Sequence, residues 1–343
     1  MLARPFETRE KRAVRPLGVS ALWAALLVLP DTDADQPVAL ELHVCPIERS
    51  NDVAWCSAGV AIDAATSASA RWASTLLVVA APRAMLYALS RSEGAAAAAL
   101  ASDVRLASGE RADACALTER FAAVVQQRTL SVWRRDGAGL QTYEHTCALR
   151  AVRLDACESA HSSLALCADE HGDILGFELA LDGALPVLAR APFFMHAASG
   201  AVLAAPVAGP SLAAVERYDD AIVALAFAGS RFALASRTHL YVRDTQRAPK
   251  GCRRPLALRL RELGLGAVVA LALWGEALLV HDDEARVVVV DARTGHVVKS
   301  CVGEQARAGV ARASSAYRYQ SIVCAGDQCG ALLPNGALLF LDL

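Results

Sequence analysis

Acidic and histidine side chains gather at two places where they could support acid/base or cation chemistry. The stretch Asp169-Glu-His-Gly-Asp173 supplies carboxylates and a histidine that could act as an acid/base group. The run His281-Asp-Asp-Glu284 could hold Mg²⁺ or Ca²⁺, because both cations prefer carboxylate oxygens. Each group follows an apolar run, where Asp and Gly also satisfy the geometry of a tight turn. We therefore expect both groups to be turns, the second one solvated.

Cysteine and histidine supply two further candidates, one nucleophilic and one metal-binding. His145 lies near Tyr143 and Cys147 in sequence, and a Cys-His pair can activate a thiol. The sequence identifies no acid that would orient this histidine, so a partly buried strand histidine is favoured. Cys324 and Cys329 could bind zinc, but no second Cys or His pair of suitable spacing accompanies them. We expect two buried or hairpin cysteines there.

Common catalytic motifs are missing from the sequence. It contains no G-x-S-x-G elbow, no P-loop and no H-E-x-x-H pair. We therefore expect no catalytic residue, no metal ligand and no cofactor, and we interpret the chain as a non-enzyme. The alternative is an enzyme that uses a carboxylate or histidine, such as Asp169 or His281, in the central funnel of its fold.

Composition limits the class of protein. The 343 residues are 55% hydrophobic and 20% charged, which is enough apolar surface for a large core. The net charge of −2 excludes a wholly basic nucleic-acid binder but leaves room for a local basic face. Ten cysteines are spread thinly along the chain, a distribution that indicates reduced thiols and a location in the nucleus or cytoplasm.

The elements that must position these residues repeat along the chain. Short apolar strands that end in a polar or acidic turn recur about every 45 residues, an interval typical of four-stranded propeller blades. These strands are predicted at 39–48, 84–91, 129–136, 173–183, 239–246, 286–295 and 337–343. Second apolar runs precede them at 75–80, 121–126, 163–168, 231–236 and 276–281, and first strands at 221–227 and 268–274. No amphipathic helix of suitable length separates these strands, which disfavours a parallel α/β sheet.

Seven repeats predict an all-β fold, a seven-bladed β-propeller in one closed ring. We expect an N-terminal tail at 1–16, the propeller at 17–343, and a long inter-blade loop at 190–214. The apolar run 17–29 is interpreted as strand material of the first blade, with a cleaved signal peptide as the alternative. The alanine run Ala95–Ala99 is expected to be a loop or a short helix. No segment is long enough to predict a transmembrane helix.

Three strands and their turns, at 130–136, 240–244 and 287–295, resemble the third strand and turn of WD40 repeats. The sequence departs from that family in three ways. It has no Trp-Asp pair, Gly295-His296 follows a strand instead of preceding a blade, and the usual Asp-His network cannot be traced. The departures leave the blade boundaries open.

Two stretches resemble signatures of the non-catalytic propeller subunit of tRNA (guanine-N7) methyltransferase. In 166–177, Asp169, Gly172 and Asp173 match the first signature, although Glu170 replaces its lysine. In 232–243, the second signature is matched at Arg237, Val242 and Arg243, without the acidic pair that follows its arginine. The first match is also an ordinary hairpin turn.

The resemblance implies a scaffold that forms a heterodimer with a catalytic methyltransferase subunit, which itself binds S-adenosylmethionine and tRNA. Arg237 and Arg243 would then contact the partner. A nearby basic run could touch RNA or an acidic protein, because guanidinium groups bind phosphate and carboxylate bidentately. Its residues are Arg247, Lys250, Arg253 and Arg254, followed by Arg259 and Arg261. The alternatives are a solvated inter-blade loop and a propeller scaffold in a different complex, and no membrane association is expected.

Overall fold

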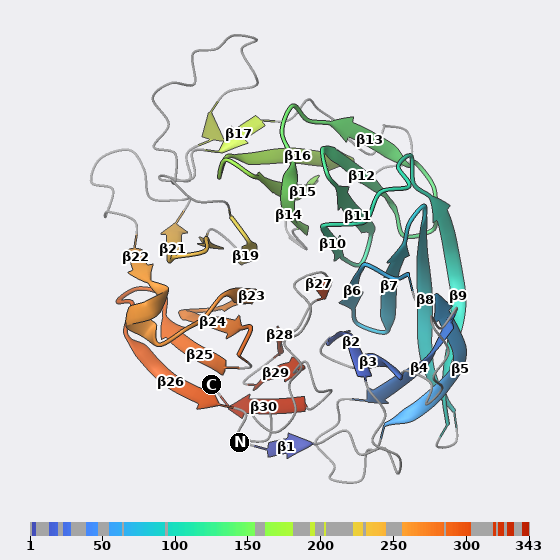
Figure 1. Cartoon of the computed structure of the whole chain (residues 1–343), viewed down its shortest axis with the longest axis horizontal. Helices are drawn as coiled ribbons and strands as arrows, with labels where there is room; N and C mark the ends of the chain where they lie inside the picture. The colour runs from blue at the N-terminus through green and yellow to red at the C-terminus, as the bar shows by residue number, and fades with distance from the viewer. Residues whose placement is uncertain are drawn as a thin grey trace.

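The chain is built from β-sheets, antiparallel apart from one short parallel pair, that are arranged around a centre (Figure 1). The computed structural model describes residues 2–4, 14–19, 23–28, 39–46, 55–63, 65–92, 95–154, 162–180, 193–195, 202–203, 222–228, 231–244, 256–284, 286–302, 318–319, 322–325, 328–332 and 338–342. In this part of the chain the strands form seven sheets. The described residues contain no helix long and apolar enough to cross a membrane.

Each sheet is one blade, and we number the blades along the chain. Blade 1 contains β2 (Val14–Val19), β3 (Trp23–Val28), β4 (Ala39–Pro46) and β5 (Cys56–Asp63). Blade 2 contains β6 (Ala68–Trp72), β7 (Thr75–Ala80), β8 (Arg83–Ser92) and β9 (Ala95–Arg105). Blade 3 contains β10 (Ala114–Leu117), β11 (Phe121–Gln126), β12 (Thr129–Arg134) and β13 (Gln141–Glu144). Blade 4 contains β14 (Leu149–Leu154), β15 (Ser162–Asp169), β16 (Ile174–Ala180), β17 (Phe193–Met195) and β18 (Val202–Leu203).

The remaining blades follow the same order. Blade 5 contains β19 (Ala224–Ala228), β20 (Arg231–Ala235), β21 (His239–Asp244) and β22 (Leu256–Arg259), and the 3₁₀ helix η1 (Leu260–Leu263) follows it. Blade 6 contains β23 (Val268–Trp274), β24 (Ala277–Asp282), β25 (Arg286–Asp291) and β26 (Val297–Val302). Blade 7 contains β28 (Ile322–Ala325), β29 (Gln328–Leu332), β30 (Leu338–Asp342) and β1 (Leu2–Arg4). The predicted repeats at 39, 84, 129, 173, 239, 286 and 337 are the third strands of these blades, so the all-β, seven-bladed propeller is confirmed.

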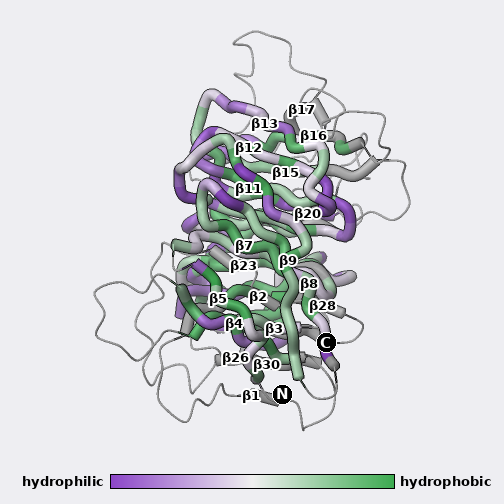
Figure 2. The backbone as a smooth tube through the Cα atoms, turned by 90° about the vertical axis from the view of Figure 1, so that its right-hand side faces the viewer, coloured by the Kyte–Doolittle hydropathy of each residue, from purple (hydrophilic) through white to green (hydrophobic). Residues whose placement is uncertain are grey.

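The second strand of a blade is buried on both faces, which explains its unbroken apolar sequence. In β7, Leu76 and Val78 pack in the cluster shared with blade 1, whereas Leu77 and Val79 pack in the cluster shared with blade 3. Alternate side chains of a strand point to opposite faces, so a strand between two neighbours needs apolar residues at every position. Figure 2 shows the same partition, with hydrophobic segments along the strands and hydrophilic ones mainly at the turns.

Blade 7 is completed by the N-terminal strand. β1 pairs antiparallel with β30, with Leu2 opposite Phe340 and Arg4 opposite Leu338. The strand from the beginning of the chain therefore lies in the same sheet as the last three strands (Figure 1). We expected residues 1–16 to form a tail, and the structure differs, because β1 covers the edge of β30 and β2 begins at Val14. A strand edge left unpaired would expose backbone donors and acceptors.

Two further segments differ from the sequence-based expectation. The alanine run is not a loop or helix but part of β9, which pairs with β8 along its length and buries Ala96 against blade 1. Within the loop expected at 190–214, β17 pairs with β16, and β18 pairs with β17; the rest of that range lies outside the described residues. In β9 pairing to a neighbouring strand overrides the helical preference of alanine, whereas the Phe and Val residues of β17 and β18 themselves favour strands.

One strand was not anticipated at all. β27 (Arg318–Tyr319) lies between blades 6 and 7 in sequence but pairs in parallel with β6 of blade 2, at Ala68 and Ser69. Figure 1 places it near the centre of the ring. Two residues carry no periodic pattern, so nothing in the local sequence could have indicated this pairing.

Candidate functional site

The turns between the second and third strands of the blades lie on one face of the ring, because every blade has the same strand order. This face carries the β11–β12, β15–β16, β20–β21 and β24–β25 turns, and also the connections that lead from one blade to the next. We call it the Arg237 face, after the exposed arginine in the β20–β21 turn. The candidate acid/base, cation and partner-binding residues that the structure describes are found mainly here.

Asp282 is the last residue of β24 and is fully buried. Its carboxylate, which the sequence offered as a possible cation ligand, is already hydrogen-bonded within the protein. Its Oδ1 accepts hydrogen bonds from the backbone N–H groups of Glu284 at 3.0 Å and Arg286 at 2.8 Å. Its Oδ2 accepts from the backbone N–H of Gly266 at 2.8 Å and from Nε of Arg286 at 2.6 Å. Both oxygens are therefore used to cap the turn and to tie it to the connection before blade 6. The expected turn is confirmed here, although Asp282 itself is not solvated.

Asp169 occupies the corresponding position at the end of β15 and is also buried. Its Oδ1 accepts hydrogen bonds from the backbone N–H groups of His171 and Asp173, each at 2.9 Å. Gly172 completes the turn with a φ of 85°, a conformation that glycine adopts without strain. The stretch Asp169–Asp173 is thus the turn expected from the sequence.

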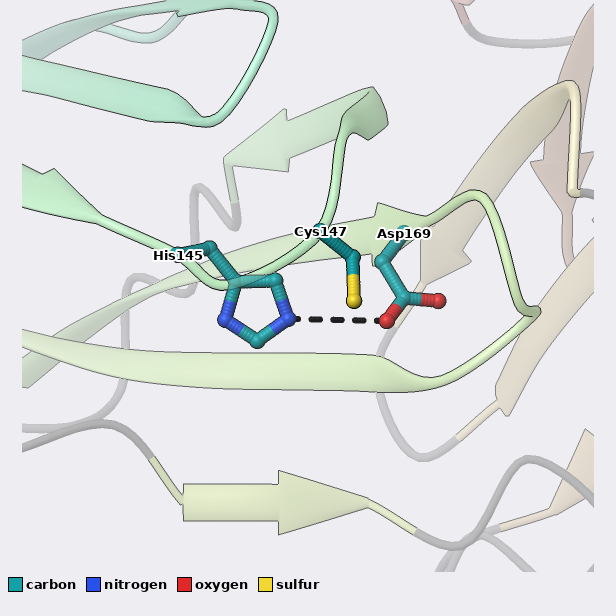
Figure 3. Close-up of side chains that lie close together, drawn as sticks. All are labelled: His145, Cys147 and Asp169. Carbon is teal, nitrogen blue, oxygen red and sulfur yellow. Dashed lines mark ion pairs between the residues drawn. The ribbon is translucent and has the colours of Figure 1, made fainter.

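His145 lies in the connection from β13 to β14, and its Nε2 faces Oδ2 of Asp169 at 3.5 Å. The thiol of Cys147 stands beside the pair, and the three ligand-type atoms lie within 4.8 Å of one another (Figure 3). The sequence identifies no acid that would orient His145 and no Asp-His network. The structure corrects both points at blade 4, because Asp169 is the acid that faces His145. The available signal was the recurrence of an aspartate at the end of a second strand, at Asp169 and Asp282.

Other side chains hold this region in place. The hydroxyl of Tyr143 lies 3.3 Å from Nδ1 of His145, and the Tyr143 ring packs edge-on against Phe177. Glu170 accepts a hydrogen bond from the backbone N–H of Ala148 at 3.2 Å and pairs with Arg150 at 3.3 Å. These interactions lower the pKa of Glu170, the hydrogen bond from Ala148 being the main cause.

The structure describes only some of the predicted partner-binding residues. Arg237 is exposed in the β20–β21 turn, on the face just defined. Arg243 lies on β21, where its backbone pairs with Phe232; the structure describes only its backbone. Arg247, Lys250, Arg253 and Arg254 all lie outside the described residues. At the end of the basic run, Arg259 and Arg261 are exposed, and Arg259 lies 3.8 Å from Glu262.

Cys324 and Cys329 lie opposite each other in the register of the β28–β29 hairpin. The structure describes only the backbone of this pair, and its register agrees with the hairpin cysteines expected from the sequence.

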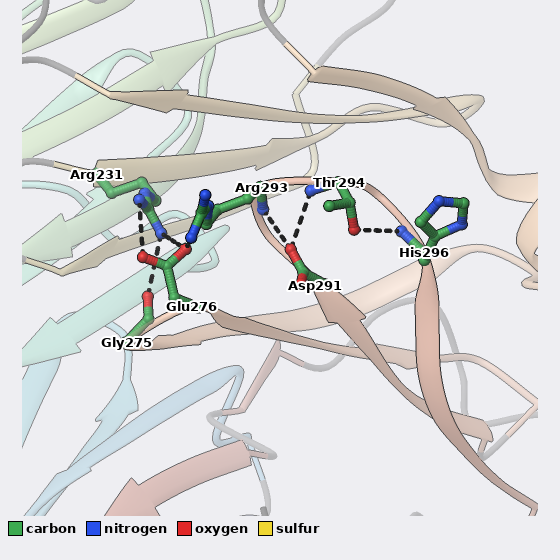
Figure 4. Close-up of polar contacts among 7 residues, drawn as sticks. All are labelled: Arg231, Gly275, Glu276, Asp291, Arg293, Thr294 and His296. Atoms are coloured by element: carbon green, nitrogen blue, oxygen red, sulfur yellow. Dashed lines mark hydrogen bonds and ion pairs between the residues drawn. The ribbon is translucent and has the colours of Figure 1, made fainter.

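The opposite face carries a separate ionic network that links blades 5 and 6 (Figure 4). Arg231 reaches across from β20 to Glu276, with Nη1 and Oε2 2.9 Å apart, and donates to the carbonyl of Gly275. Nearby, Asp291 accepts the backbone N–H groups of Arg293 and Thr294, and these hydrogen bonds lower its pKa. All of these groups are accessible to water, so each ion pair adds little to stability.

A cavity of about 100 Å³ lies among the first strands of blades 2 to 7. Its charged lining residues in the described part of the chain are Asp113, Arg150 and Arg153, and Arg150 lies 3.4 Å from Asp113. Asp169 and His281 are not among the residues that line it. The funnel enzyme considered from the sequence therefore has neither of its two reactive groups at this cavity.

His281 is a buried histidine whose burial lowers the pKa to about 4, with Asp282 opposing the shift. Because the ordinary pKa of histidine is about 6.5, the unfolded chain takes up a proton below that pH while the folded chain does not. The contribution of neutral His281 to the free energy of unfolding is therefore fully present above pH 6.5 and is lost as the pH falls from 6.5 toward 4. At pH 5 we expect His281 alone to cost about 2 kcal/mol relative to pH 7.

Urea unfolding of wild type and His281→Gln at pH 7 and pH 5 measures this contribution. The pH-dependent loss should be smaller by about 2 kcal/mol in the variant, since glutamine does not titrate. Equal pH-dependent losses in wild type and His281→Gln would contradict the prediction.

Comparison with known proteins supports the architecture and nothing narrower. No protein-family model and no curated protein matches the sequence. Among solved structures, Saccharomyces cerevisiae Sqt1 is similar over 100% of both chains, with a TM-score of 0.58 and 12% identity. The computationally designed Ika8 protein is similar over 97% of both chains, with a TM-score of 0.52 and 11% identity. At such identities the likeness concerns the fold alone, and the chain is a seven-bladed β-propeller of the WD40-like type.

Proposed function

We propose that this chain is a non-catalytic interaction scaffold that binds a protein partner through the Arg237 face. The observation that carries the proposal is the internal capping of this face. Buried Asp282, Asp169 and Ser236 each bind backbone N–H groups of a β-turn, and Ser236 accepts those of Thr238 at 3.2 Å and His239 at 3.0 Å. Exposed side chains such as Arg237 are therefore presented on pre-ordered turns. Such pre-organisation lowers the entropic cost of binding.

Charged side chains at the tips of these turns suit recognition of a charged partner surface. Besides Arg237, the exposed residues include Asp283 and Glu284 in the β24–β25 turn and His171 in the β15–β16 turn. Both signs of charge are present, and complementary charges raise specificity and association rate more than affinity. We infer a folded protein partner, for which the scaffold acts by positioning.

The narrower form of the proposal is an accessory subunit that stabilises a tRNA (guanine-N7) methyltransferase, with tRNA bound through that partner. It is supported by the sequence resemblance and by the exposure of Arg237. The matching residues Asp169, Gly172 and Asp173 build a capped turn, so their presence is also explained by local geometry. The described cysteines Cys45, Cys56, Cys115, Cys147 and Cys167 are free thiols, which accords with the nucleus or cytoplasm.

Charge reversal at Arg237 tests the proposal. We expect Arg237→Glu to weaken binding of the co-purifying partner at least about 10-fold, because a like charge replaces a complementary one. Arg120→Glu is the matched control: Arg120 is exposed in the β10–β11 turn, on the opposite face of the ring, and should leave binding unchanged. The partner is identified by mass spectrometry after affinity purification, and its affinity for each variant is measured by titration.

The outcomes separate the broad proposal from the narrow one. A methyltransferase that co-elutes in equal amounts, and is lost with Arg237→Glu, supports the narrow form. A different stoichiometric partner that is lost with the same variant supports the scaffold and excludes the methyltransferase. Binding that is undiminished by Arg237→Glu overturns the assignment of this face.

A further inference from the structure

Three side chains with different ligand atoms converge beside the β15–β16 turn. A ring nitrogen of His145, Sγ of Cys147 and a carboxylate oxygen of Asp169 lie within 4.8 Å of one another, and Figure 3 shows the thiol directed into the space between ring and carboxylate. Imidazole, thiolate and carboxylate are the ligands that Zn²⁺ uses in proteins. The residues come from two segments, the β13–β14 connection and the end of β15, and packing holds both.

Asp282 shows what a purely structural aspartate looks like at this position. Both of its oxygens accept short hydrogen bonds, and Arg286 balances its charge at 2.6 Å. In Asp169 only Oδ1 is used in this way. Among the described residues the one ionic partner of Oδ2 is His145, at 3.5 Å, which is longer than an ordinary N–H···O hydrogen bond. This buried oxygen therefore retains capacity for another positive group.

The histidine is oriented as a ligand. Its side chain is 9% exposed and that of Asp169 is 3% exposed, so both groups are largely removed from water. The hydroxyl of Tyr143 lies 3.3 Å from Nδ1, which leaves Nε2 directed toward Asp169 and Cys147. Histidines that bind metals usually engage their second ring nitrogen with a polar group in this manner, which fixes the ring and the tautomer.

The thiol supplies access to the site. Cys147 is partly exposed, whereas the side chains of His145 and Asp169 are only 9% and 3% exposed, so an ion can reach the cluster past the thiol. A second group of potential ligands, Glu170 and His171, also has atoms within 4.8 Å of this thiol. Glu170 is already held by Arg150 and Ala148, which leaves His171 or water for a fourth coordination position.

We infer that His145, Cys147 and Asp169 form a binding site for a divalent transition metal, with Zn²⁺ the best match to the ligand set. Cys147 loses its thiol proton to solvent on binding, and thiolate plus carboxylate balance the two positive charges of the ion. Three protein ligands and one open position give tetrahedral coordination. The site lies on the Arg237 face and ties the β13–β14 connection to blade 4. The inference does not depend on the proposed scaffold function.

Cobalt substitution tests the site directly. The full-length, reduced and metal-free protein is titrated with Co²⁺, whose tetrahedral thiolate complexes have visible d–d bands and a near-ultraviolet thiolate-to-metal band. One equivalent of Co²⁺ should produce both bands, and Zn²⁺ should abolish them by displacement. Cys147→Ser should remove the thiolate-to-metal band and weaken binding at least about 100-fold, because losing a ligand costs more than losing one of its supporting contacts.

Two further variants distinguish ligation from unfolding. Cys56→Ser removes another partly exposed free thiol, on β5 of blade 1, and should leave the spectrum unchanged. Asp169→Asn keeps the Oδ1 acceptor that caps the turn but removes the negative charge, and should weaken Co²⁺ binding at least about 10-fold without changing the circular dichroism spectrum. The inference is overturned if wild type shows no thiolate-to-metal band, or if the band persists in Cys147→Ser.

Discussion

Replacing Asp282 by alanine is expected to lower the free energy of unfolding by about 3–5 kcal/mol, because one partner of a buried ion pair is removed. The carboxylate is fully buried at the end of β24 and accepts four hydrogen bonds. Without it, Nε of Arg286 and the backbone N–H groups of Gly266, Glu284 and Arg286 lose their acceptor. A buried donor left without an acceptor costs about 1–3 kcal/mol.

Urea unfolding at pH 7 measures this effect. Asp291→Ala is the matched control, since Asp291 caps the β25–β26 turn of the same blade but is accessible to water. Its loss should cost about 1 kcal/mol, because water can replace the lost acceptor. If both variants lost the same stability, burial of Asp282 would not be the cause. Asp282→Ala should also speed the hydrogen exchange of the backbone N–H groups of Glu284 and Arg286, since these groups lose the carboxylate that accepts their hydrogen bonds.

Replacing Trp133 by alanine should cost about 3–5 kcal/mol, the range found for removing a buried aromatic side chain. Trp133 lies on β12, is fully buried, and packs in the cluster between blades 2 and 3 with Leu77, Val79 and Val124. A cavity at this interface weakens the contact between two blades. Each blade buries its faces only against its neighbours, so the whole ring is affected.

Two other variants separate packing from hydrogen bonding at this position. In the described part of the chain, Nε1 of Trp133 is buried without a hydrogen-bond acceptor. Trp133→Phe removes that N–H together with part of the ring, so we expect a loss of less than about 2 kcal/mol. Trp274→Ala, at a tryptophan that is 41% exposed, should cost about 1 kcal/mol or less. A loss in Trp133→Phe as large as that in Trp133→Ala would contradict this account.

Local sequence was sufficient to predict the strands in the interior of the ring. The second strands β7, β11 and β24 are covered on both faces by neighbouring blades. Such burial requires mostly apolar residues along the strand, so these strands can be recognised from composition alone. The polar turns that follow the third strands recur at intervals of 44 to 51 residues, apart from one longer interval of 66 residues between blades 4 and 5. Together they indicated the number of blades and the closed ring.

Strands whose identity depends on a distant partner could not be predicted in the same way. β1 belongs to blade 7 only because β30 offers a free edge, and β27 is a strand only through its pairing with β6. β9 is rich in alanine, which favours helices, yet pairing with β8 overrides that preference. In each case the stabilising contact lies outside the segment itself.

The candidate site shows the same division. The sequence indicated that Asp169–Asp173 and His281–Glu284 are turns, because the turn chemistry of Asp and Gly acts over a few residues. It could not show that Asp169 faces His145 and Cys147, or that Asp282 uses both oxygens while Asp169 uses one.

What the sequence alone determined is therefore the set of residues that must be buried in strands or placed in turns, since burial on two faces and turn geometry are local demands. Only the tertiary structure decided which strands share a sheet and which side chains meet across a turn. The physical reason is that edge pairing and the convergence of buried polar groups depend on segments brought together by the closed ring, and their spacing along the chain carries no record of those contacts.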